Sequence, residues 1–120
     1  MIFEIENHLA MREALDELCL YLAQNGISPE RVFDSKLVAT ELVGNVLRHS
    51  DGIAKLCGEI AGEFIELIVL SSIPFIPPKV SRKAELYAES GRGLYLVDSV
   101  CEERLSTSDG GIKVRIRIEK

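Results

Sequence analysis

A glycine-containing turn in the C-terminal third of the chain has the residue types of an anion-binding site. Residues 89–94 read Glu-Ser-Gly-Arg-Gly-Leu and lead into apolar residues at helical spacing. Backbone N–H groups at a helix start, together with the helix dipole, favour an anion such as phosphate. Gly91 and Gly93 would let the backbone approach that anion closely, and Arg92 adds a positive charge. The segment matches neither of two specific phosphate-binding motifs, the Walker loop and the Rossmann fingerprint. The alternative interpretation is therefore an ordinary junction between a loop and a helix.

A second group of candidate residues lies in the stretch Glu41-Leu-Val-Gly-Asn45. On a helix, Glu41 and Asn45 stack on one side because they are four residues apart. Asp34 and Arg48 fall on the same stripe. A polar stripe of this kind is either a binding surface or simply the solvated side of an amphipathic helix. Gly44 is unusual inside a helix, which a close approach by another element would explain.

The helices that must position these groups can be predicted from apolar spacing. Residues 8–25 have apolar side chains at helical intervals, and Gly26 stands where a helix C-terminus is expected. Ser28 and Pro29 have the types of an N-cap and a first helical residue, so a second helix is predicted from there to about residue 49. A third helix is predicted to follow the glycine turn.

Five strands complete the predicted fold. The last of them alternates apolar and charged residues, which predicts a sheet with one face in water. Short turn segments join neighbouring strands, so hairpins should dominate. We therefore expect one domain over residues 1–120, an α/β sandwich of the α+β type, with a mixed, largely antiparallel sheet and helices on one face. The predicted strands are 1–6, 53–60, 64–70, 103–106 and 112–118.

Composition excludes several classes of protein. The 120 residues are 47% hydrophobic, which is enough for a core, and carry a formal net charge of -5. An acidic balance argues against direct binding to nucleic acid, which usually needs a basic surface. The three cysteines are far apart, so neither a disulfide framework nor a zinc site is expected. No apolar stretch suits a membrane span or a signal peptide, and the expected location is the cytoplasm.

The combination of motifs resembles a known family. The pattern E-L-V-x-N-x-x-x-H, a hairpin, a loop, S-G-R-G-L-Y-L-V and a final G-G-x-x-V strand occur in the order typical of histidine-kinase-like ATPases. Within that family the chain looks most like the compact serine kinases that act as anti-sigma factors. The resemblance covers nearly the whole chain. Glu41 and Asn45 match the family's N box, and Gly91 and Gly93 match its second glycine box.

This resemblance implies specific roles. Asn45 would hold the Mg²⁺ that accompanies ATP, and Glu41 would be the general base for a serine hydroxyl. The backbone from Gly91 to Leu94, with Arg92 nearby, would bind the phosphates. Residues 77–90 would form a lid over the nucleotide. The implied partners are a sigma factor and an antagonist protein, and the resemblance also implies a homodimer.

One position departs from the family pattern. The family has an aspartate at the end of a central strand that accepts a hydrogen bond from the adenine amino group. Here that position falls on Leu70 or Ser71, depending on the alignment. A serine hydroxyl accepts this bond more weakly than a carboxylate, and leucine not at all. Loss of a charged hydrogen bond to adenine weakens the free energy of nucleotide binding by about 1.5–3 kcal/mol, which lowers the affinity roughly ten- to a hundredfold.

Three functions are therefore compatible with the sequence. The first is an ATP-dependent serine kinase that phosphorylates an anti-sigma antagonist. The second is a non-catalytic member of the same fold that regulates by protein contact alone. The third is a detached ATPase subunit of another signalling protein.

Overall fold

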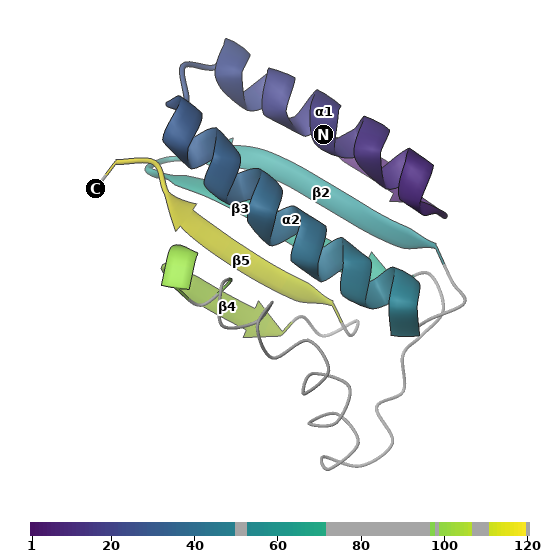
Figure 1. Ribbon diagram of the computed structural model, residues 1–120. Coiled ribbons are helices and arrows are strands. Elements are labelled where there is room, and N and C mark those ends of the chain that lie inside the picture. Colours follow the sequence, from purple (N-terminus) through teal and green to yellow (C-terminus); the bar gives the residue numbers. More distant parts are fainter. Residues whose placement is uncertain (50–52, 72–96, 98, 107–110, 120) are drawn as a thin grey trace.

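The computed structural model describes residues 1–49, 53–71, 97, 99–106 and 111–119. Two helices lie side by side over one face of a five-stranded sheet (Figure 1). The fold is α+β, as predicted. The elements are β1 (Ile2–Ile5), α1 (His8–Gln24), α2 (Pro29–His49), β2 (Ala54–Ala61), β3 (Phe64–Ser71), β4 (Glu103–Ser106) and β5 (Ile112–Arg117).

The five strands are arranged in the order β1-β2-β3-β5-β4, and every neighbouring pair is antiparallel. The expectation of a mixed sheet was therefore wrong. Each pair in this order runs antiparallel, including β3 and β5, which are neighbours although β4 separates them in sequence. The four-residue strands β1 and β4 form the two edges of the sheet.

Local signals set the ends of the helices. The side chain of Asn7 caps α1 by accepting a hydrogen bond from the N–H of Ala10 at 2.8 Å. Gly26 ends the helix with φ +83°, a backbone conformation that favours glycine. Ser28 then caps α2, because its Oγ accepts the N–H of Arg31 at 3.3 Å and Pro29 takes the first helical position. The predicted boundary between the helices is confirmed.

The core lies between the helices and the inner face of the sheet. Leu18 of α1 and Leu42 of α2 are almost fully buried against strands β2 and β3. At Gly58 of β2 the layers meet so closely that an added Cβ would lie 2.9 Å from Cδ1 of Leu18. An added side chain would therefore force Leu18 to shift at the point where α1 packs against the sheet. The buried apolar side chains that share this core include Ile5, Leu15, Leu22, Val38, Val43, Leu56, Ile65, Leu67, Val97, Val114 and Ile116.

The outer face of the sheet carries a network of ion pairs. Glu66 of β3 is only 8% exposed. Its Oε2 accepts a hydrogen bond from Nε of Arg115 at 2.8 Å, and Nζ of Lys113 lies 3.6 Å away. Arg115 also reaches Glu103 of β4, at 3.4 Å. The alternation predicted for the last strand is confirmed, since Val114 and Ile116 point into the core while the charged residues point outward.

Several further predictions from the sequence can be compared with the structure. All three cysteines are free, as expected. Val97, Ser99 and Val100 are helical, which agrees with the C-terminal end of the predicted third helix. The predicted lid (77–90) and the glycine turn (91–94) lie outside the described residues. Among the helices that the structure describes, none is both long and apolar enough to cross a membrane.

Candidate functional site

The second half of α2 brings three of the predicted polar residues together. Glu41 and Asn45 are both half-buried on one side of the helix, and Arg48 follows one turn later at the surface. Nη2 of Arg48 donates a hydrogen bond to Oδ1 of Asn45. The i, i+3 spacing of Asn45 and Arg48 is what places the guanidinium over the amide. The amide oxygen of Asn45 thus already has a positively charged partner.

The stripe predicted along α2 does not act as one unit. Asp34 is held by Arg31, whose Nη1 donates to Oδ2 at 2.6 Å, while Nη2 of Arg31 reaches Oε1 of Glu30 at 3.0 Å. Arg31 is itself buried. Asp34 lies two turns before Glu41, about 10 Å along the axis at a rise of ~1.5 Å per residue. The N-terminal end of the stripe therefore stabilises the start of α2 and takes no part in the candidate site.

The register of β3 distinguishes the two residues that match the missing aspartate. Ser71 pairs with Ala54, and Val69 pairs with Leu56. Ala54, Leu56 and Val69 are all buried on the side of the helices. Because side chains alternate along a strand, Ser71 belongs to this inner side and Leu70 to the outer face. Ser71 is therefore the residue placed on the same side of the sheet as α2.

Two of the predicted site segments, the end of β3 and the C-terminal part of α2, lie at the same end of the molecule. Ser71 ends β3 beside Ala54, the first residue of β2, and the start of β5 lies opposite Val69. The C-terminal end of α2 reaches the same end, on the right in Figure 1. The stripe of Glu41 and Asn45 and the end of β3 are thus brought to one end of the sandwich. Gly91, Arg92, Gly93 and Leu94 lie outside the described residues.

A cavity of about 190 Å³ lies near this end but is a different feature. It is lined by Glu4, Ile53, Lys55, Leu70 and Ser71. Glu4, Lys55 and Leu70 are cross-strand neighbours on the outer face of the sheet. Ser71 stands at the end of β3 and lines this cavity too, although its register places it on the inner side of the sheet. The helix stripe with Glu41 and Asn45 lies on the other face, so this cavity is not the site predicted from the sequence.

The residues of α2 are compatible with a hard divalent cation. Within the part of the chain that the structure describes, no three His, Cys, Asp or Glu side chains cluster as metal ligands. A Mg²⁺ ion bound here would therefore take one oxygen from Asn45 and the rest of its ligands from water and phosphate, which is a common arrangement for this ion. The oxygen of Asn45 accepts a hydrogen bond from the exposed Arg48, so a bound Mg²⁺ would have to replace this bond.

Gly44 precedes Asn45 on α2, and its surroundings can be tested by substitution. A Cβ built on Gly44 would meet only Nη1 of Arg48, at 3.7 Å, within 4 Å among the described atoms. No close approach by another described element explains the glycine. We expect Gly44→Ala to raise the free energy of unfolding by up to about 1 kcal/mol, because alanine is the better helix former. Urea unfolding followed by circular dichroism measures this change, and a loss of stability would contradict the unstrained contact with Arg48 that an added methyl group would make here.

No protein-family model matches the sequence, and no curated protein matches it either.

Proposed function

We propose that this chain is an ATP-binding anti-sigma regulatory factor with the histidine-kinase-like ATPase fold, acting as a serine/threonine-protein kinase on an antagonist protein. The main support is the position of Glu41 and Asn45. They lie on one side of α2, and the C-terminal end of that helix lies at the same end of the molecule as the end of β3 that carries Ser71 (Figure 1). The order of the motifs in the sequence is the reason for choosing this family. The two-layer α+β architecture is compatible with that choice.

Each residue has a defined task in this proposal. Asn45 holds Mg²⁺, which supplies positive charge to the phosphates. Glu41 accepts the proton from the attacking serine hydroxyl. The serine oxygen forms a bond to the γ-phosphorus while the bond from that phosphorus to the β–γ bridging oxygen breaks, and ADP leaves. Gly91 to Leu94 bind the phosphates with Arg92, and Ser71 accepts from the adenine amino group.

A second candidate function rests on the end of β3. Neither Leu70 nor Ser71 is acidic, so adenine would be held by a hydroxyl at best. A chain that has lost nucleotide affinity would keep the fold and regulate a sigma factor by contact alone. The two functions differ in whether the protein binds Mg²⁺ and ATP at all.

Calorimetric titration with ATP in the presence of Mg²⁺ tests the proposal. We expect Asn45→Ala to weaken ATP binding about tenfold, since only one of several Mg²⁺ ligands is removed. Glu41→Gln should leave binding intact and abolish phosphoryl transfer, because the amide cannot accept the proton.

Asn25→Ala is the matched control. Asn25 follows α1 at the opposite end of α2, which at ~1.5 Å per residue is roughly 30 Å long. This variant should bind ATP like the unmodified chain. Absence of binding at millimolar ATP would exclude the kinase and leave the contact regulator.

A further inference from the structure

The guanidinium group of Arg48 lies back over the preceding turn of α2. Its Nη2 donates a hydrogen bond to Oδ1 of Asn45, and its Nη1 lies 3.7 Å from the point where a Cβ of Gly44 would stand. Long side chains on a helix lean toward its N-terminus, which brings Arg48 over the residues three and four positions earlier. A positive charge therefore already lies against the amide oxygen that is proposed to bind Mg²⁺.

The amide group of Asn45 has its nitrogen buried and its oxygen in contact with Arg48. Nδ2 of Asn45 is buried, whereas Oδ1 accepts from a side chain that is exposed. A guanidinium can only donate hydrogen bonds, so it favours the orientation of the amide in which the oxygen faces it. A hard cation binds through the same atom, because Mg²⁺ takes oxygen ligands. Arg48 and a bound Mg²⁺ thus use one and the same oxygen.

These two cations exclude each other at Oδ1 of Asn45. A carbonyl oxygen has two lone pairs, but Mg²⁺ binds its ligands at about 2.1 Å and a guanidinium nitrogen lies about 2.8 Å from its acceptor. Two positive charges would then lie within a few ångströms of each other, where their repulsion is strong. The guanidinium must therefore leave the oxygen before the ion can bind. The free energy of this hydrogen bond is lost from the affinity for the ion.

A free Mg²⁺ ion would gain little at this position. Asn45 is uncharged, and the described residues include no cluster of three His, Cys, Asp or Glu side chains that could add ligands. The triphosphate of ATP carries oxygens that the ion can keep as ligands when it binds to the protein. An ion that arrives with ATP can therefore replace the guanidinium at a lower cost than an ion that arrives alone.

We propose that Arg48 takes the place of the metal ion on Asn45 when no nucleotide is bound, and that Mg²⁺ displaces it when the ion enters with ATP. The inference rests on the proposed function and adds an order of binding to it. Free Mg²⁺ does not occupy the site, and the complex of Mg²⁺ with ATP does. Arg48 thereby sets the concentration of this complex at which the site is filled.

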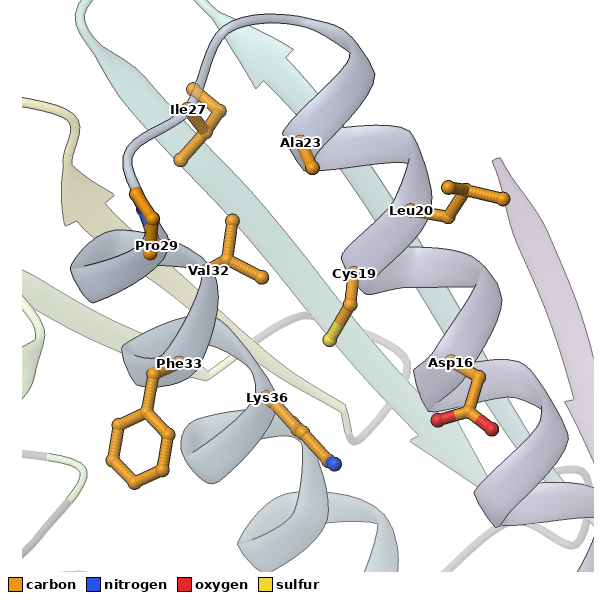
Figure 2. A pocket seen from close by; sticks show the side chains of 9 residues that line it. All are labelled: Asp16, Cys19, Leu20, Ala23, Ile27, Pro29, Val32, Phe33 and Lys36. Carbon is orange, nitrogen blue, oxygen red and sulfur yellow. The ribbon is translucent and has the colours of Figure 1, made fainter.

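Two other effects of a surface arginine can be separated from this competition. Arg48 lies in the last turn of α2, where a positive charge stabilises a helix, and urea unfolding of Arg48→Ala measures that effect. A general effect of net charge is measured with Lys36→Ala, which removes the same charge from the same helix. Lys36 lines the apolar groove between α1 and α2 (Figure 2). It lies roughly 18 Å from Arg48 along the helix, at a rise of ~1.5 Å per residue.

Titration of the isotope-labelled chain with Mn²⁺, without nucleotide, tests the competition directly. Mn²⁺ prefers the same oxygen ligands as Mg²⁺, and its unpaired electrons broaden the NMR signals of groups close to it. The side-chain amide signal of Asn45 should broaden at an about two- to tenfold lower Mn²⁺ concentration in Arg48→Ala than in the unmodified chain, which corresponds to the loss of one hydrogen bond. Lys36→Ala should behave like the unmodified chain. Broadening at the same Mn²⁺ concentration in all three proteins would overturn the inference.

Calorimetric titration with ATP gives the second comparison. Arg48→Ala should raise the affinity about two- to tenfold in Mg²⁺, and should not raise it in EDTA, where no ion competes for Asn45. In a chain that already carries Asn45→Ala, Arg48→Ala should not raise the affinity in Mg²⁺ either, since the shared oxygen is gone. A lower affinity of Arg48→Ala for ATP in Mg²⁺ would overturn the inference, because Arg48 would then support the nucleotide. If no variant binds ATP, the proposed function is excluded, while the titration with Mn²⁺ still decides whether Arg48 competes for Asn45.

Discussion

Ser71→Asp is expected to raise the affinity for ATP about ten- to a hundredfold, the equivalent of a charged hydrogen bond worth ~1.5–3 kcal/mol. The reason is positional. Ser71 shares the inner side of the sheet with the buried Val69 and pairs with Ala54. A carboxylate at this position is on the side of α2, where the proposed function places the nucleotide. The carboxylate can accept a hydrogen bond from the amino group of adenine. Guanine has a carbonyl oxygen at the same ring position, which cannot donate a hydrogen bond, so the affinity for GTP should not rise.

Leu70→Asp provides the matched control. It introduces the same carboxylate one residue earlier, on the outer face of the sheet, and should leave ATP affinity unchanged. Calorimetric titration of both variants with ATP and GTP gives the comparison, and thermal unfolding confirms that each variant folds. Equal gains in both variants, or a gain for GTP, would contradict the proposed orientation of the base.

The contact between Leu18 and Gly58 should produce the largest change in stability. Leu18 is fully buried, so Leu18→Ala should lower the free energy of unfolding by about 2–5 kcal/mol. Gly58→Ala places a methyl group 2.9 Å from Cδ1 of Leu18 and 3.4 Å from Cδ2 of Leu67, and should cost about 1–3 kcal/mol. In the double variant the new methyl group occupies space that Leu18 has vacated. The double variant should therefore lose less free energy of unfolding than the two single variants lose together, by about 1 kcal/mol or more.

Urea unfolding of the four proteins in this cycle measures the coupling. Leu9→Ala is the control, because Leu9 is exposed and its truncation should change stability by less than about 0.5 kcal/mol. Additive costs at Leu18 and Gly58 would show that the two positions do not touch.

Short-range signals predicted the elements of this fold well. The end of α1 at Gly26 and the cap formed by Ser28 are determined by a few neighbouring residues, and each was found where the sequence places it. The turn between β2 and β3 is one residue shorter than the connection predicted at 61–63, because Ala61 still pairs with Phe64. The stripe with Glu41 and Asn45 follows from helical spacing in the same way.

Long-range pairings were not predictable from the sequence. Burial of Glu66 depends on Arg115, which is 49 residues away, and nothing in the local pattern of β3 indicates that partner. The close contact between Gly58 and Leu18 depends on where α1 crosses β2. The choice between Leu70 and Ser71 needed the register of β3 against β2. The sequence did not indicate the groove lined by Leu20 of α1 and Phe33 of α2, because its two walls come from different helices.

The arrangement of the sheet also bears on aggregation. β3 is the most apolar strand, with the sequence Phe-Ile-Glu-Leu-Ile-Val-Leu-Ser, and a segment of that kind readily adds to strands of other chains when its edge is free. Here it is paired on both sides, by β2 and β5. The described strands at the edges of the sheet are only four residues long, and β4 begins with the charged pair Glu103 and Arg104. Short edge strands are poor templates for intermolecular strand pairing, and the charges of β4 weaken that edge further, so the native molecule keeps β3 away from strands of other chains.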